Sequence, residues 1–465
     1  MHAICICILS GLQWPNKYPT YRLFAPVDLV QPLIFKDSSS AADITVEDKA
    51  YQTVKGFGAS LTDSGAQSLS QLKQKNPTAY SELLKKLFDP SFNASSAGIT
   101  YLRVPLGASD FSHTSYSYDD APGDTALKNF NIDIAPPYVF EVLNDIQDIN
   151  NILKVHVVPW SPPGWMKDSN KVNGGNFKSD MATVYAQYLL KALQGFESKG
   201  NEPRNTNPSL PSCKMTYEQE GAIGVALKPL MKNNGFSAVK LIGFEHNWSL
   251  YQYPISLMKS HSDVFDGVAF HCYGGKVAFQ DDFFKTFPNK DLYFTECTGM
   301  DGTDWWDDVL WQTEHLFQAT IQHHSQTALM WQLISGEELP GSNSCYKGKK
   351  GNACRAVVTV NSDGTYKLNQ EYYAIAHAAR AVLPRDTGGS FGQLINSTVA
   401  PGPNTVNVTV NAYKTTRVNA QDPTMYSLHV LNYNMHKGPY TVKFQDKQLS
   451  YSFPVGVSTL HFTEV

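Results

Sequence analysis

Short apolar segments alternate with longer amphipathic segments along most of the chain, and this alternation constrains the fold more than any other feature. Stretches with helical periodicity, such as TAYSELLKKLFD and MATVYAQYLLKALQGF, lie between most of the apolar segments. Alternation of this kind is typical of β-α units and a parallel sheet that is buried on both faces. Seven segments rich in Val, Ile, Leu, Phe or Tyr are predicted as strands, at residues 54–60, 99–106, 154–160, 239–247, 267–273, 291–297 and 327–333.

The predicted strands are one fewer than a closed (β/α)8 barrel needs. Such a barrel has eight strands and takes about 250 residues. The interval between residues 160 and 239 has room for one more unit, and Asn201-Glu202-Pro203 lies in it. This tripeptide is typical of the end of a barrel strand, yet almost nothing apolar precedes it. We therefore predict an α/β fold, a (β/α)8 barrel whose fourth strand is truncated.

The pattern changes after about residue 388. The segments TVNVTVNAYKTTRVN, MYSLHVLNYN, YTVKFQ and LSYSFPVGVSTLHF alternate polar and apolar residues between Gly, Pro and Asn turns. They predict a small antiparallel β-sandwich. The expected organisation is an irregular N-terminal segment (1–26), strands that join the sandwich (27–52), the barrel (53–387) and the sandwich (388–465).

Composition narrows the classes of partner. Only 17% of the residues are charged and the net charge is −4, so a nucleic-acid partner is not expected. No run of about 18 apolar residues predicts a membrane span. Many Tyr, Trp, Ser, Asn and Thr residues fit a monomeric extracellular protein that handles neutral polymers. The N-terminus, MHAICICILSGLQW, lacks a basic region and a clear cleavage site, so we favour a truncated or mispredicted start over a signal peptide.

The seven cysteines fit no zinc-binding pattern. Cys345 and Cys354 bracket a polar loop that a disulfide could close, and we favour this bridge over two unrelated thiols if the chain is secreted. Cys272 and Cys297 end neighbouring predicted strands, so either they bond to one another or they are two buried thiols. Glycosylation sequons give mild support to secretion and begin at Asn93, Asn247, Asn396 and Asn407.

Active sites of such barrels lie at the carboxyl ends of the strands. These ends lack a metal-ligand spacing, a Gly-rich phosphate loop and a nucleophile-elbow serine, so neither a metal nor a cofactor is expected. Two carboxylates and several aromatic rings at one mouth instead predict glycoside cleavage. An oxocarbenium-like transition state needs an acid for the leaving oxygen and a carboxylate beside the anomeric carbon, and tryptophan faces stack on sugar rings.

Glu296 is the candidate nucleophile because it ends the apolar run LYFTE. An ionised Glu there costs several kcal/mol unless it is paired, and Arg103 and Tyr273 are candidate partners. The alternative is a structural Glu in a salt bridge. Glu202 is the candidate acid/base, with Asn201 placed to bind a sugar 2-hydroxyl; the alternative is a solvated Glu in a turn.

His271 and Tyr273 alternate along one strand and point to the same face, although a lone strand His is more often a core residue. Trp160 and Trp331 end strands and serve either as sugar platforms or as core residues.

Together these segments resemble glycoside hydrolase family 30 over roughly residues 50–465. The motifs, in order, are KGFGASLTDSGA, YLRVPLGASDFS, VVPWSPPGWMKDS, NEP, GFEHNW, FHCYGG, YFTECTG and LMWQL. The family includes glucosylceramidases and endo-β-1,6-glucanases, and the EHNW and TECTG forms look most like the fungal endo-β-1,6-glucanase branch. The resemblance implies a barrel with an attached β-sandwich and a retaining double displacement, with no cofactor.

The resemblance also implies roles for residues. Glu296 matches the nucleophile and Glu202 the acid/base, whose carboxyl groups should lie about 5–5.5 Å apart, with a raised pKa for Glu202 in the free enzyme. Further positions match the glycone subsite, and these are Arg103, Asp110, Trp160, Asn201, His271, Tyr273 and Trp331.

One departure from the family bears on activity. Family members place a full apolar strand before Asn-Glu-Pro, whereas here a helical pattern runs into it, and about five strand residues are missing. A gene-model error or a true deletion would explain this. Either the helix shortens so that residues 194–198 form a poor strand, or the barrel has a defect there; we favour the first, because an open barrel exposes strand edges. The functional alternatives are an endo-β-1,6-glucanase, a glucosylceramidase and a catalytically impaired carbohydrate-binding protein.

Overall fold

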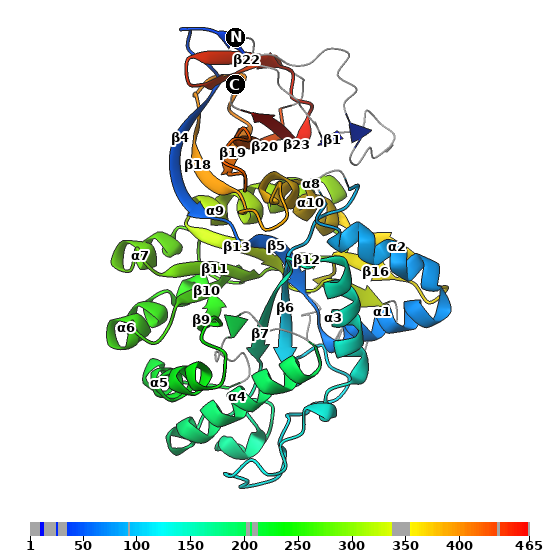
Figure 1. Cartoon of the computed structure of the whole chain (residues 1–465), viewed down its shortest axis with the longest axis vertical. Helices are drawn as coiled ribbons and strands as arrows, with labels where there is room; N and C mark the ends of the chain where they lie inside the picture. Colours follow the sequence, from blue (N-terminus) through cyan, green and yellow to red (C-terminus); the bar gives the residue numbers. More distant parts are fainter. Residues whose placement is uncertain are drawn as a thin grey trace.

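A closed barrel of eight parallel strands forms the larger part of the structure (Figure 1). This computed structural model describes residues 35–91, 94–200, 213–336, 354–434 and 438–463, and the strand backbone at 10–13, 25–26 and 205–206. Each of the seven predicted strands is present, so the predicted (β/α)8 fold is confirmed. In chain order the barrel strands are β5 (Gly56–Ser60), β6 (Tyr101–Leu106), β7 (Lys154–Pro159), β8 (Asn205–Thr206), β9 (Lys240–Asn247), β10 (Gly267–His271), β11 (Asp291–Glu296) and β13 (Ser325–Met330).

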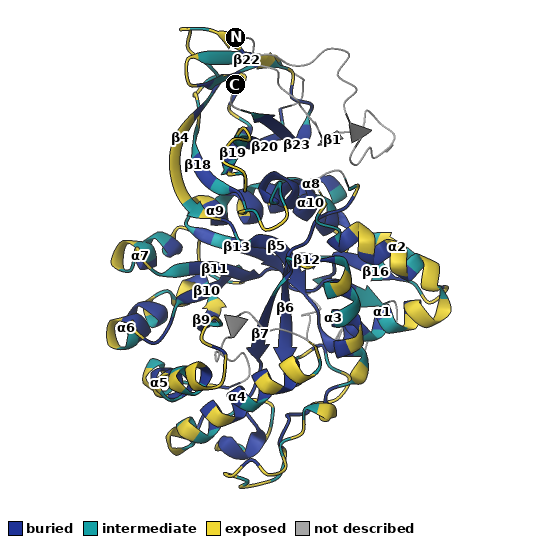
Figure 2. Ribbon diagram, in the orientation of Figure 1, coloured by how far each residue is buried: buried dark blue, intermediate teal, exposed yellow. Residues whose placement is uncertain are grey.

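Helices cover the outside of the barrel and bury one face each (Figure 2). Several begin at a side-chain cap: Thr62 accepts a hydrogen bond from the Gly65 N–H, and Thr216 forms a capping box with Gln219. No helix in the described ranges is long and apolar enough to cross a membrane. The main helices are α1 (Asp63–Lys75), α2 (Pro77–Phe88), α3 (Pro137–Ile149), α4 (Ala182–Ser198), α5 (Tyr217–Asn233), α6 (Gln252–His261), α7 (Phe279–Thr286), α8 (Trp305–Gln312), α9 (Ala319–Gln322) and α10 (Gln370–Val382).

The fourth strand differs from the expectation in its position. Helix α4 continues to Ser198, so the prediction that residues 194–198 become a strand is wrong. Its buried residues recur at helical spacing and hold this segment against the barrel; they include Tyr185, Leu189, Leu193 and Phe196.

Strand β8 has only two residues, and Asn205 pairs with His156 of β7 and with Lys240, the first residue of β9. The strand therefore lies near the amino end of the barrel and begins after Glu202 in the chain. The expectation that Asn-Glu-Pro closes the fourth strand is corrected accordingly, while Asn201 and Glu202 themselves lie outside the described residues.

A second sheet of ten strands lies outside the barrel, beside helices α8, α9 and α10 (Figure 1). Its neighbouring strands are antiparallel except for the parallel pair β21–β4, and they enclose one apolar core that includes Ile44, Leu428, Val442 and Phe462. This arrangement confirms the attached β-sandwich. In sheet order the strands are β2 (Ala25–Pro26), β1 (Ser10–Gln13), β23 (Gly456–Thr463), β20 (Met425–Asn432), β19 (Val408–Thr415), β18 (Gln393–Val399), β4 (Ile44–Thr53), β21 (Tyr440–Phe444), β22 (Lys447–Tyr451) and β3 (Lys36–Asp37).

Two buried histidines lie where the barrel helices meet the sandwich. His377 of α10 contacts the Thr459 hydroxyl at 3.3 Å, and His429 of β20 is fully buried with neither ring nitrogen hydrogen-bonded among the described residues. Burial, together with a smaller effect of the neighbouring His377, lowers the pKa of His429 to about 3. His429 is therefore neutral in the folded protein, and its protonation opposes folding.

Gly58 of β5 allows β5 and β6 to approach closely. A Cβ atom on Gly58 would lie 1.8 Å from the Tyr101 carbonyl oxygen, which is a backbone atom and cannot turn away. We predict that Gly58→Ala lowers the free energy of unfolding by about 3 kcal/mol, at the upper end of the usual cost of overpacking. Urea unfolding followed by fluorescence measures this. Gly402→Ala is the matched control, since its nearest neighbour is 3.4 Å away, and equal effects of both substitutions would contradict the prediction.

His429 should make the fold sensitive to acid. The pKa of His429 is lower in the folded protein than in the unfolded chain, where it is near 6.5. The contribution of His429 to stability is therefore complete above pH 6.5 and is lost as the pH falls toward the folded pKa. Relative to His429→Leu, the wild type should lose about 2 kcal/mol between pH 6 and pH 4, since each pKa unit corresponds to about 1.4 kcal/mol. Urea unfolding at both pH values measures the difference. The exposed His113→Leu serves as the control, and a pH-independent difference for His429→Leu would refute the assignment.

Candidate active site

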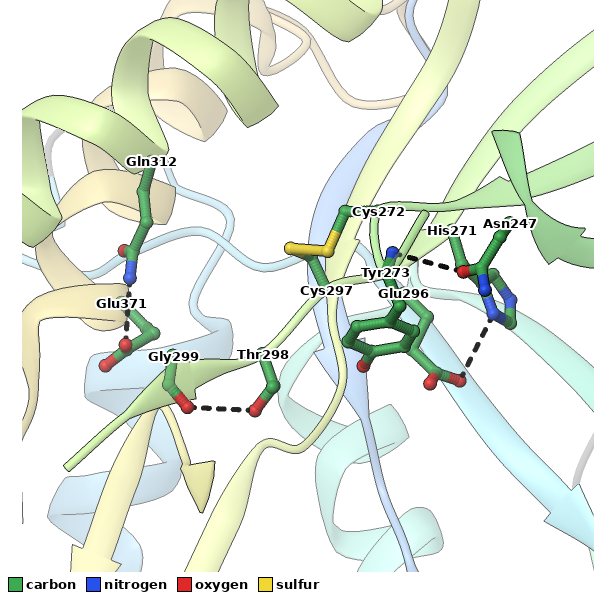
Figure 3. Close-up of a disulfide and its surroundings, with 10 residues drawn as sticks. All are labelled: Asn247, His271, Cys272, Tyr273, Glu296, Cys297, Thr298, Gly299, Gln312 and Glu371. Atoms are coloured by element: carbon green, nitrogen blue, oxygen red, sulfur yellow. Dashed lines mark hydrogen bonds and ion pairs between the residues drawn. A yellow bond between two sulfur atoms is a disulfide. The ribbon is translucent and has the colours of Figure 1, made fainter. Parts of the chain in front are cut away.

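Glu296, the last residue of β11, lies in the barrel mouth with 8% of its surface exposed (Figure 3). Nη1 of Arg103, from β6, donates to Oε2 of Glu296 at 2.8 Å. The predicted pairing of these two residues is therefore confirmed. The arginine is fully buried, so this contact stabilises the ionised carboxylate in surroundings with little water.

A second carboxylate, Glu245 of β9, is bound to the same arginine. Its Oε1 lies 2.5 Å from Nε of Arg103, and the residue is 3% exposed. Burial alone would raise the pKa of Glu245, but the charge of Arg103 and contacts with His271 and His156 hold it well below its ordinary value. Arg103 thus places one positive charge between two carboxylates.

Glu245 is not among the site residues predicted from the sequence, although the sequence contains a signal for it. The run VKLIGFE is apolar up to a terminal Glu, as LYFTE is for Glu296. The same energetic argument applies, because a Glu at the end of a buried strand requires a charged or hydrogen-bonding partner.

Two imidazoles complete the buried cluster. His271 places Nε2 3.5 Å from Oε1 of Glu245 and Nδ1 3.9 Å from Oε2 of Glu296. His156 lies deeper, with Nε2 3.6 Å from Oε2 of Glu245. Burial lowers the pKa of His156 to about 4 despite the opposing charge of Glu245, so this ring is neutral near pH 7.

Tyr273 covers the outer side of Glu296 (Figure 3). Its surface is 48% exposed, its backbone N–H donates to Oδ1 of Asn247 at 3.1 Å, and its side chain hydrogen-bonds Glu296. Burial of the hydroxyl end is the largest cause that raises the pKa of Tyr273 well above its ordinary value, and the negative charge of Glu296 is the second. The hydroxyl therefore stays protonated and can donate to the carboxylate. The exposed Asp110 contributes to the same shift and so lies on this side of the barrel.

Trp160 and Trp331 pack against the guanidinium of Arg103. The guanidinium carbon lies 4.6 Å from the Trp160 ring centroid and 5.6 Å from that of Trp331, and the two rings are 5.0 Å apart. Both tryptophans are buried, so their observed partner is the arginine. A sugar-platform role for either ring stays a prediction.

The structure thus brings Glu296, Arg103, His271, Tyr273, Trp160 and Trp331 together, with Asp110 at the edge. Asn201 and Glu202 lie outside the described residues. The expected separation of 5–5.5 Å between the two catalytic carboxyl groups therefore stays a prediction.

The disulfide between Cys272 and Cys297 is present, with the Cα atoms 5.3 Å apart. Cys354 is also disulfide-bonded. Cys345, its predicted partner, lies outside the described residues, so that pairing stays a prediction. Cys213 is a buried free thiol.

Comparison with known proteins places this site in a family. Residues 54–311, more than half of the chain, match the glycosyl hydrolase family 30 TIM-barrel domain. An endo-1,6-beta-D-glucanase of Neurospora crassa is 28% identical over 385 residues, which cover 76% of each chain. Glucosylceramidase 3 of Caenorhabditis elegans is 24% identical over 407 residues, covering 77% of this chain and 72% of that protein.

A solved structure extends the likeness to the whole fold. The endo-beta1,6-glucanase BT3312 is 23% identical, aligns over 100% of both chains and gives a TM-score of 0.81. The fold, the strand positions of the site and the match of the barrel together show that this chain belongs to glycosyl hydrolase family 30.

Proposed function

We propose that this protein is a retaining β-glycosidase that cleaves β-1,6-linked glucan, with Glu296 as the nucleophile. The observation that carries the proposal is the position of Glu296 at the mouth of the barrel, paired with Arg103 at 2.8 Å and covered by Tyr273. The fungal endo-1,6-beta-D-glucanase, 28% identical over 76% of the chain, supports this substrate.

The reaction proceeds in two displacements. In the first, an oxygen of Glu296 attacks the anomeric carbon while the glycosidic bond breaks and its electron pair leaves with the leaving-group oxygen. Glu202 is proposed to protonate that oxygen, and Asn201 to bind the sugar 2-hydroxyl. In the second, Glu202 takes a proton from water, the water oxygen attacks the anomeric carbon, and the bond to Glu296 breaks, so the configuration is retained.

The charges around Glu296 suit this chemistry. Arg103 pairs with the Glu296 carboxylate and also with Glu245, so its positive charge is divided between two carboxylates. The remaining negative charge favours the positive charge that develops at the anomeric carbon. We assign sugar-binding roles around the same carbon to Asp110, Trp160, His271, Tyr273 and Trp331.

The glucosylceramidase alternative has less support. Over similar lengths, the identity with the C. elegans glucosylceramidase is 24%, against 28% for the fungal glucanase. A lipid substrate also favours an exposed apolar rim. Of the large apolar residues exposed in the described ranges, only Tyr273 and Leu250 closely follow the carboxyl ends of barrel strands. We place the protein outside the cell, where disulfides such as Cys272–Cys297 persist.

A catalytically impaired glucan-binding protein is a second candidate, because β8 has two residues and begins after Glu202. The nucleophile and its partners come from other strands, so glucan binding does not require an acid from the fourth strand. Wild-type protein that binds β-1,6-glucan but releases no reducing sugar would establish this candidate.

Substitution of the nucleophile tests the proposed function. Wild-type protein should release reducing sugars from β-1,6-glucan, and Glu296→Gln should lower kcat by roughly three orders of magnitude or more while the fold persists. Reducing-sugar assays and circular dichroism measure both properties. Glu82→Gln, an exposed residue on α2, is the matched control. Turnover by Glu296→Gln at a rate close to that of the wild type would show that another residue is the nucleophile.

The role of Glu202 can be tested separately from that of Glu296 by the choice of the substrate's leaving group. Glu202→Ala should abolish cleavage of the glucan but largely preserve the first step with a 2,4-dinitrophenyl β-glucoside, whose leaving group needs no proton. Added azide should then yield the β-glucosyl azide, because it attacks without a general base. Product analysis by NMR checks the configuration. Equal losses on both substrates, without azide product, would argue against an acid/base role.

A further inference from the structure

A disulfide joins the two strand ends that carry the residues around the nucleophile (Figure 3). Cys272 stands between His271 and Tyr273 after β10, and Cys297 directly follows Glu296 of β11. The proposed mechanism uses neither sulfur. The bond nevertheless connects the backbone of the proposed nucleophile to the backbone of its two neighbours.

The register of the strands explains why a crosslink fits here. Phe270 pairs with Phe294, but the next residue, His271, pairs with Glu296, so a bulge shifts the register at this point. The bulge puts the side chains of His271 and Glu296 beside each other. A bulge also interrupts the hydrogen-bond ladder, so the relative position of the two chains is less constrained than in a regular pair.

Cys297 connects three strand ends at once. Its disulfide leads to β10, and its carbonyl oxygen accepts a hydrogen bond from the Trp331 N–H, after β13, at 2.7 Å. The Cys272 N–H donates to the Glu296 carbonyl oxygen at 3.2 Å. Trp331 in turn packs on Arg103, the cationic partner of Glu296.

The side chains make few contacts with one another. His271 approaches Glu296 only to 3.9 Å, and Tyr273, although its side chain hydrogen-bonds Glu296, is about half exposed. Their positions relative to the carboxylate therefore depend strongly on the backbone between them. The disulfide adds a covalent bond to this connection between the ends of β10 and β11.

We propose that the Cys272–Cys297 disulfide positions Tyr273 and His271 against Glu296, so that the reactivity of Glu296 depends on the oxidation state of this bond. The inference rests on the proposed function, since it takes Glu296 as the nucleophile. Reduction by a small dithiol adds two electrons and two protons: both cysteines become thiols, and the dithiol becomes a cyclic disulfide. Cys272 is partly exposed whereas Cys297 is buried, so we expect the dithiol to attack at Cys272.

The test uses a probe that reports on Glu296 without Glu202. With 2-deoxy-2-fluoro-β-D-glucosyl fluoride, an oxygen of Glu296 attacks the anomeric carbon and fluoride leaves with the bonding electron pair, so no acid is needed. Intact-protein and peptide mass spectrometry follow formation of the glycosyl ester. Oxidised wild-type protein should be labelled at Glu296, and Glu296→Gln should not.

The double variant Cys272→Ala/Cys297→Ala should be labelled about ten- to a hundredfold more slowly at saturating probe, because misplacement by about 1 Å costs about a hundredfold. The probe concentration giving half-saturation should change much less. Cys213→Ala, which removes the free buried thiol, should behave as the wild type. A dithiol should slow the wild type reversibly and leave the double variant unaffected, which separates this bond from the disulfide of Cys354.

The outcomes distinguish the two proposals. Absence of label on Glu296 in the oxidised wild type overturns the proposed function. A labelled wild type together with an equally fast double variant, both assayed well below their unfolding temperatures, overturns the positioning role and leaves the bond a purely stabilising one. If the double variant does not fold, the reversible dithiol response of the wild type decides, and a labelling rate unaffected by reduction refutes the inference.

Discussion

The buried guanidinium of Arg103 is the interaction on which the rest of the site depends. It lies between Glu245 and Glu296, at 2.5 and 2.8 Å, and is itself fully buried. A charge buried in this way is stable only when its partners are fixed, and removing one partner of such a group typically costs 3–5 kcal/mol. The pairs therefore constrain β6, β9 and β11 to one arrangement, with Glu296 at the mouth of the barrel.

The surroundings of this cluster exclude water on one side and leave it open on the other. Trp160 and Trp331 pack over the guanidinium and keep its field strong, since electrostatic interactions strengthen as the local dielectric falls. Tyr273, beside Glu296, is about half exposed to solvent, and this is the side from which the proposed function has the sugar enter. The bulge in β10–β11 and the disulfide after it hold the strand end that carries Tyr273 next to the strand end that carries Glu296.

Much of this arrangement could be predicted from the residues, and the failures have physical causes. The seven barrel strands are long apolar runs, so local pattern alone identifies them. Glu296 can be predicted as a site residue because an acid that ends such a run requires a partner. Glu245 satisfies the same condition but was not selected, since its partner is revealed only when β6 and β9 are placed side by side. Residues 194–198 were misassigned because helical burial of Leu193 and Phe196 outweighs the need of the barrel for a longer strand. The parallel pair β21–β4 joins segments almost four hundred residues apart, beyond the reach of local pattern.

The proposed chemistry of the site has two parts, and these come from different strands of the barrel. Strand β8 pairs with His156 and Val157 in the middle of β7 and with Lys240 and Leu241 at the start of β9. The residues Arg103, Glu245, His271 and Glu296 come from β6, β9, β10 and β11. Among the described residues, the ion pairs and the disulfide around Glu296 therefore come from strands other than β8. In the proposed mechanism, substrates with good leaving groups need this part of the site alone. Cleavage of a polysaccharide, whose leaving oxygen must be protonated, also needs the proposed acid Glu202. A change around Glu202 should thus remove glucan hydrolysis while sparing the reactivity of Glu296, which is why leaving-group dependence, rather than total activity, is the informative measure of this enzyme.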